Sequence, residues 1–142
     1  MISYLATNIP RFVPRGGVPA ITPTPYLPVQ GAVIIEDGRC CVMAVAGNTI
    51  QLTVTFRAFS QLAQFSEMRV RVGGMAFSER EMAAAAWEPF VRQRRYPVHV
   101  AVNWVGFYVS VQYRDAQGNM SPVYFDDISV EGMPPTPTIS AD

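Results

Sequence analysis

Proline placement limits what the first thirty residues of this chain can become. Six of the twelve prolines lie between Pro10 and Pro28. Each proline fixes its own φ, lacks an N–H donor and pushes the residue before it toward extended or polyproline geometry. A helix is therefore excluded in this segment, and so is a central strand of a sheet. We expect residues 1–30 to form an extended N-terminal arm.

The arm is too apolar for a solvated linker. It contains no acidic residue, and its only charges are those of Arg11 and Arg15. Such a segment should pack on a surface, of its own domain or of a neighbouring subunit, because exposed apolar area on this scale is unusual. Residues 22–25 also suit an aromatic groove on another protein. The side chains expected to make the contact between subunits are Tyr4, Leu5, Ile9, Phe12, Val13, Ile21, Tyr26 and Leu27.

Residues 31–131 have the pattern of a β-sandwich domain. Residues 49–57 alternate apolar and polar side chains, which is typical of a half-buried strand. Asp37-Gly38 is a hairpin signal, and the capping box at Ser78 and Glu81 predicts one short helix. About seven short strands favour an all-β sandwich, followed by a proline-rich tail at 132–142. The expected strands are residues 32–35, 40–45, 49–57, 65–72, 98–105, 107–114 and 123–130.

Residues 115–119 should form a tight turn that sets the register of the flanking strands. Asp115 is placed to accept hydrogen bonds from amides two residues on, and Gly118 and Asn119 tolerate positive φ. The run from Phe107 to Tyr113, this turn, and Asp126-Asp127-Ile128 together resemble the C-terminal half of bacterial immunoglobulin-like domains. The resemblance covers about residues 65–130, where Met68-Arg69-Val70 and the Trp87–Phe90 segment also fit. It implies an immunoglobulin-like β-sandwich and says little about function.

Few residues offer chemistry. His99 is the only histidine and lies among valines, so we interpret it as a structural or edge-strand residue. Cys40 and Cys41 are adjacent, which suits neither a zinc pair nor an ordinary disulfide framework, and we interpret them as two small thiols. A calcium site near Asp115 and Asp126 is a minor alternative to turn capping. We therefore expect no enzyme activity, no catalytic or metal-binding residue and no cofactor.

Charge points toward protein partners. Eleven basic residues, all arginine, balance eleven acidic ones, so nothing favours nucleic acid or an anionic membrane. The one basic and aromatic cluster is expected to contact an acidic patch on a protein. Its residues are Arg92, Arg94, Arg95 and Tyr96.

We therefore expect a non-enzymatic structural protein that binds a larger assembly through its arm. In size, in its arm and in lacking a secretory signal, the chain is similar to capsid decoration (cement) proteins of tailed phages. That similarity implies a homotrimer on the virion surface that clamps a major capsid or other shell protein, and thermostability where the host is a thermophile. The alternative is a secreted or cell-surface immunoglobulin-like binding module beside carbohydrate-active or adhesive proteins.

Overall fold

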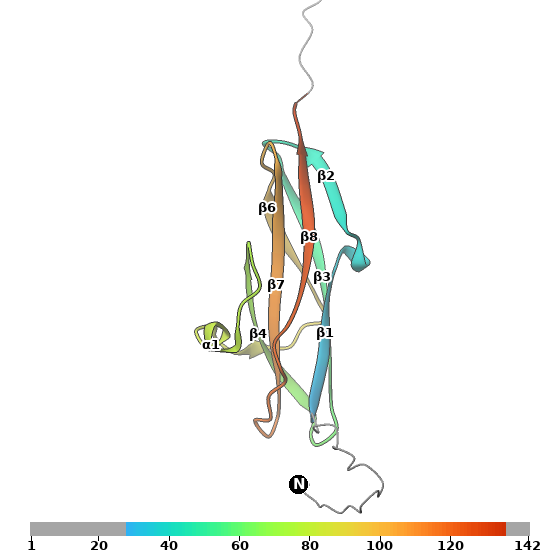
Figure 1. The fold of residues 1–142 in the computed structure, drawn as a ribbon. Coiled ribbons are helices and arrows are strands. Elements are labelled where there is room, and N and C mark those ends of the chain that lie inside the picture. The colour runs from blue at the N-terminus through green and yellow to red at the C-terminus, as the bar shows by residue number, and fades with distance from the viewer. Residues whose placement is uncertain (1–27, 136–142) are drawn as a thin grey trace, which may run out of the picture.

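In the computed structural model, which describes residues 28–135, the chain is almost entirely β-structure. One short helix and one 3₁₀ turn interrupt the strands (Figure 1). The elements are β1 (Val29–Ile35), η1 (Glu36–Gly38), β2 (Cys41–Val45), β3 (Thr49–Ser60), β4 (Phe65–Gly73), α1 (Glu79–Met82), β5 (Glu88–Pro89), β6 (Gln93–His99), β7 (Trp104–Asp115) and β8 (Tyr124–Met133).

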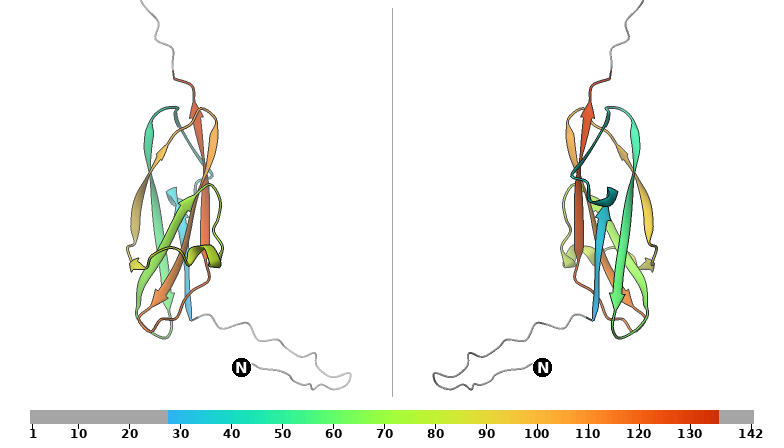
Figure 2. Two further views of the ribbon diagram at one scale, coloured as in Figure 1. Left: turned by 90° about the vertical axis from the view of Figure 1, so that its left-hand side faces the viewer. Right: turned by 90° about the vertical axis from the view of Figure 1, so that its right-hand side faces the viewer.

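The strands form two sheets that face each other as layers, seen from both sides in Figure 2. The three-stranded sheet has the order β1-β3-β6, and the five-stranded sheet has the order β2-β8-β7-β4-β5. Neighbouring strands are antiparallel except β2 and β8, which run parallel. The arrangement is a β-sandwich, as the strand pattern of the sequence predicted.

Alternating side chains of both sheets meet in one core. From β3 come Leu52, Val54 and Phe56, which are the inward residues of the alternation that the sequence shows. Tyr113 of β7 is the largest fully buried side chain, and its hydroxyl donates to the carbonyl of Ala32 at 2.6 Å. Burial raises the pKa of this phenol. Its ring lies against β1 where Gly31 has no side chain, so the two sheets approach closely there.

The expected hairpin at Asp37-Gly38 is wrong, because β1 and β2 belong to different sheets. Glu36, Asp37 and Gly38 all have positive φ, and this tight turn carries the chain from one layer to the other. The Glu36 carboxylate accepts from the amide of Thr53 at 2.7 Å. An Asp-Gly pair indicates a turn, but it does not indicate whether the next strand pairs with the previous one. The local signal therefore could not distinguish a hairpin from a crossing to the other sheet.

Strand β6 begins five residues earlier than expected and ends at His99. Arg94, Arg95 and Tyr96 of the basic cluster therefore belong to β6, and Arg92 lies just before it. Strand β5, of two residues, was not expected. The capping box is confirmed: the Ser78 side chain accepts from the Glu81 amide, and the Glu81 carboxylate accepts from the Ser78 amide. The helix ends at Met82, and residues 83–86 do not extend it.

The segment between β4 and β5 folds back onto the outer side of the five-stranded sheet. The amide of Phe77 donates to the hydroxyl of Ser110 in β7 at 3.0 Å. Trp87 lies between two guanidinium groups, those of Arg69 at 4.4 Å and Arg114 at 4.2 Å from its ring centroid. Within residues 28–135, these contacts cover the β4 side of that sheet and leave the β8 side uncovered.

Among residues 28–135, no helix is long and apolar enough to cross a membrane. The two ends of the described chain lie at opposite ends of the sandwich, with β1 beginning at one and β8 ending at the other (Figure 1).

Candidate functional site

A row of aromatic rings lies on the outer face of the five-stranded sheet. Trp104 and Tyr108 of β7 point outward, and the residues that alternate with them point into the core. Phe125 of β8 stacks on Tyr108, with ring centroids 6.2 Å apart. Trp104 is 68% exposed and Phe125 is 56% exposed. We call this surface the aromatic face and include in it the outward, exposed apolar residues of β2 and β8, which are Met43, Val45 and Met133.

Gly106 brings the two rings of β7 together. It lies between Trp104 and Tyr108, and a Cβ atom at this position would lie 3.3 Å from the Tyr108 ring and 3.7 Å from the Trp104 ring. Both rings therefore bend over the bare backbone of β7. The Trp104 and Tyr108 rings thus lie on either side of Gly106, and Phe125 stacks on Tyr108.

The charge on the aromatic face is acidic. Asp127 pairs with Tyr108 and Glu131 pairs with Trp104 across the β7–β8 ladder, so both carboxylates lie beside the rings. Within residues 28–135 neither carboxylate is in an ion pair. None of the outward residues of β2 and β8 is basic. A partner that is both apolar and basic would match this surface.

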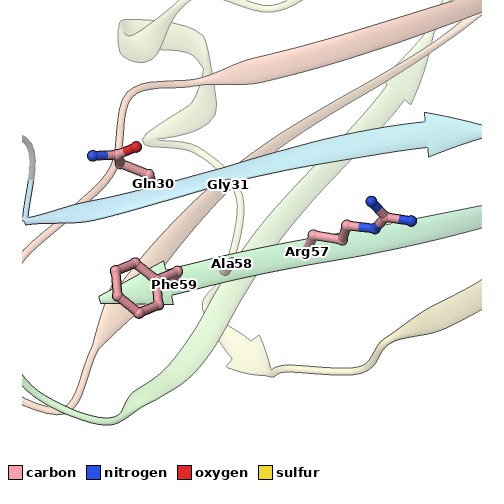
Figure 3. Close-up of a pocket in the computed structure, with 5 residues that line it drawn as sticks. All are labelled: Gln30, Gly31, Arg57, Ala58 and Phe59. Carbon is pink, nitrogen blue, oxygen red and sulfur yellow. The ribbon is translucent and has the colours of Figure 1, made fainter. Parts of the chain in front are cut away.

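The opposite outer face, on the three-stranded sheet, is polar and basic. Its outward residues are mostly threonine and glutamine, with Arg57 on β3 and Arg95 on β6. A hollow of about 290 Å³ lies beside Arg57 and is lined by Gln30, Gly31, Arg57, Ala58 and Phe59 (Figure 3). A second, of about 380 Å³, lies between Arg57 and Arg92, and its other lining residues are Phe56, Ala58, Gln64 and Phe90.

The residues that line these two hollows are suited to binding a small anion and not to catalysis. Their lining supplies two guanidinium groups and two amides, and no carboxylate, histidine, cysteine or hydroxyl. Acid–base or nucleophilic catalysis needs one of those groups in reach of the substrate. Arginine without a carboxylate beside it favours a carboxylate, sulfate or phosphate group.

The residues of the expected basic patch do not share one surface. Arg94 and Tyr96 lie on the inward side of β6, whereas Arg92 and Arg95 are exposed. Arg94 forms an ion pair with Glu88 of β5 at 2.5 Å, which joins the edge strands β6 and β5 of the two sheets. The hydrogen bond to Glu88 raises the pKa of Arg94, and burial raises that of Tyr96. The protein-contact role assigned to this cluster stays a prediction.

The predicted turn residues lie together. Asp115 accepts from the amides of Gln117 and Asn119 at 2.9 and 3.0 Å, from the Asn119 side chain, and from the Ser60 hydroxyl at 2.9 Å. Burial opposes ionisation of this carboxyl, but the hydrogen bonds from Asn119, Ser60 and Gln117 outweigh it and lower its pKa. Gly118 has a φ of +88°. Asp115 and Asn119 therefore hold the turn by hydrogen bonds, and Gly118 supplies its positive φ. The role of the turn in setting the strand register stays a prediction.

The two cysteines were interpreted as thiols, and this is wrong: Cys40 and Cys41 form a disulfide with each other. The chain bends at Cys40, just before β2 begins at Cys41, so the two side chains do not alternate across a strand. Cys40 is exposed and Cys41 is half-buried. The disulfide lies at the edge of the five-stranded sheet, beside Ser129 of β8.

Other predicted residues lie apart or outside the described chain. All eight apolar arm residues fall in 1–27, outside the described residues. Asp126 accepts from the amide of Ile35 at 2.8 Å, and so joins β8 of the five-stranded sheet to β1 of the three-stranded sheet. Asp115 is occupied by its turn, and among residues 28–135 no three His, Cys, Asp or Glu side chains gather as a metal site would require.

No family model matches the chain, and neither curated proteins nor solved structures yield a match.

Sequence reasoning missed the aromatic face, although a signal for it exists. Residues 104–109 are apolar or aromatic at nearly every position, so both sides of this strand are apolar. A strand with one solvated side should alternate. The outward residues Trp104 and Tyr108 break that rule, and Phe125 breaks it on β8. Excess apolar character on an outward side predicts a second contact surface.

Proposed function

We propose that this protein is a non-enzymatic structural protein, a capsid decoration (cement) protein that binds a virion shell and its own copies. The observation that carries the proposal is the aromatic face, because exposed apolar area of this extent on a sheet is typical of a protein contact. The sequence of the arm supplies a second apolar surface for the same purpose. A homotrimer bound to a shell protein on the virion surface would bury both.

We further propose that the sandwich is immunoglobulin-like. Its strand order separates β1, β3 and β6 from β4, β7 and β8, as strands A, B, E and C, F, G are separated in that fold. The short β5 takes the place of the extra strand beside C, and β2 adds to the outer edge beside β8. The chain departs from antibody domains because its cysteines bond each other rather than joining the two sheets.

The proposal predicts that a shell protein is encoded beside this gene, and sedimentation with that shell protein tests the proposed binding. Assembled shells would be mixed with the full chain, with a chain lacking residues 1–27, and with a chain lacking residues 136–142 as the matched control. The full chain and the control should travel with the shells on a gradient. The chain without the arm should stay at the top. Equal behaviour of all three would contradict the proposal.

A second candidate function is a secreted or cell-surface binding module. The Cys40–Cys41 disulfide favours it, because disulfides persist in oxidising surroundings. Virion surfaces meet the same condition, so the disulfide suits both candidates. The basic hollows beside Arg57 would serve such a module as an anion-binding site. Glycoside hydrolase genes beside this one, in place of capsid genes, would favour the second candidate.

A further inference from the structure

We propose that the aromatic face binds the proline-rich arm, residues 1–27, of this same protein. The inference rests on the proposed function, in which the arm of one copy contacts a neighbouring copy. Five prolines lie between residues 10 and 27. Proline-rich segments dock on aromatic side chains because polyproline geometry is already extended and loses little entropy on binding. Trp104, Tyr108 and Phe125 supply such a surface as one row.

The charges of the arm and of the aromatic face are complementary in sign and in spacing. The arm has Arg11 and Arg15 and no acidic residue, whereas the face has Asp127 and Glu131 and no basic residue. Four residues span roughly 12 Å in polyproline geometry. Four residues of a strand span roughly 13 Å. The two arginines of a docked arm can therefore reach the two carboxylates together.

The other outer face of the sandwich does not match the arm. Its outward charged residues on β3 and β6 are Arg57 and Arg95, which would repel Arg11 and Arg15. Its one exposed large apolar residue on β3 is Phe59, with threonines along the rest of the strand. The outer side of the five-stranded sheet also has arginines, Arg69 and Arg71 on β4 and Arg114 near the end of β7. Charge and apolar pattern therefore favour only the part of that sheet around Asp127 and Glu131 for the arm.

The arm is long enough to cover the aromatic face. It joins the domain at Pro28, at the end of the sandwich where β8 also begins (Figure 1). Twenty-seven residues in polyproline geometry reach roughly 80 Å. The ten residues of β8 span roughly 30 Å. The arm therefore reaches the face of its own or an adjacent copy, and in the proposed function it comes from the adjacent one.

Trypsin cleavage of the full chain tests the inference. The chain has no lysine, so Arg11 and Arg15 are the trypsin sites of the arm. Docking should protect both, because cleavage then needs the undocked arm. The double variant Trp104→Ser, Phe125→Ser should be cut at these sites about tenfold faster than the parent. The matched control is Phe59→Ser, which removes a ring of similar exposure, 59% against 56% for Phe125, from the other sheet. It should be cut at the rate of the parent.

A charge variant tests the same contact without removing a ring. Asp127→Asn with Glu131→Gln keeps the shape of both side chains and removes both charges. Cleavage at Arg11 and Arg15 should again become faster, and added salt should no longer change it. Circular dichroism of every variant should match the parent, since all the altered side chains except Glu131 are exposed and none is in the core.

Two results would overturn the inference. In one, the parent is cut as fast as a synthetic peptide of residues 1–20, which would mean that the arm is undocked. In the other, the arm is protected equally in the parent and in the face variants, which would place it elsewhere. The latter leaves the proposed function standing if removal of residues 1–27 still abolishes assembly. Protection that does not depend on protein concentration would support the face as the docking site and contradict the exchange of arms between copies.

Discussion

At the scale of single residues, Gly31 and Tyr113 decide how closely the two layers approach. The Tyr113 ring occupies the space where any other residue at position 31 would place its Cβ atom, and that atom would also collide with the Arg57 carbonyl. The Arg57 carbonyl and the buried Tyr113 ring cannot both move away from a new Cβ atom without disturbing β1 and β3. The pair is therefore a steric requirement of the fold.

Gly31→Ala should lower the free energy of unfolding by about 1–3 kcal/mol, because the added methyl overpacks the core. The matched control is Gly74→Ala, where nothing lies within 4 Å of the new Cβ atom. That change should stay within about 0.5 kcal/mol of the parent. Urea denaturation of the three proteins measures the difference, and equal midpoints would show that β1 does not lie against Tyr113 in this way.

Asp115 should make the stability of the domain depend on pH at the acid end. Its pKa is lowered in the folded state, so its contribution is complete above the ordinary carboxyl range, near 4, and is lost as pH falls through the folded value. Asp115→Asn should melt below the parent at pH 7, and the gap should narrow toward pH 3. Thermal melts at both values measure it, and a gap that stays constant with pH would contradict the assignment.

At the scale of elements, the turn after β7 joins two strands of the five-stranded sheet. Gly118 has positive φ, and Asp115 gathers the amides around it. Gly118→Val should cost about 1–3 kcal/mol, because a β-branched side chain resists this conformation. Gly74→Val is the control, in an open position without positive φ. Chemical denaturation measures the stability of both variants. A Gly118→Val protein as stable as the parent would contradict the role of the turn in fixing the register.

The sequence predicted elements with a strong local pattern and missed those set by distant contacts. Strand β3 alternates along its length, so its core residues could be read directly. Strand β6 could not, because Arg94 occupies an inward position and is neutralised by Glu88 of the other sheet. The parallel pairing of the five-residue β2 with β8 depends on a partner more than eighty residues away, which no local signal reveals.

At the scale of the whole molecule, the aromatic face depends on strand pairing, although the apolar run at residues 104–109 hints at it. Trp104 and Phe125 come from different strands and become neighbours of one row only through the β7–β8 ladder. The arm, by contrast, is predicted from its prolines and apolar residues, and it stays a prediction because residues 1–27 lie outside the described chain. Our account joins the two: one copy supplies the segment, and another supplies the surface.

The mass of the protein in solution tests this claim most directly. Light scattering on the full chain should give a multiple of 15.7 kDa, with three copies expected. The chain lacking residues 1–27 should give the mass of one copy and an unchanged far-ultraviolet circular dichroism spectrum, because residues 28–135 contain both sheets and the core cluster between them. A full chain that stays a monomer at every concentration, or a truncated chain that still assembles, would contradict the account.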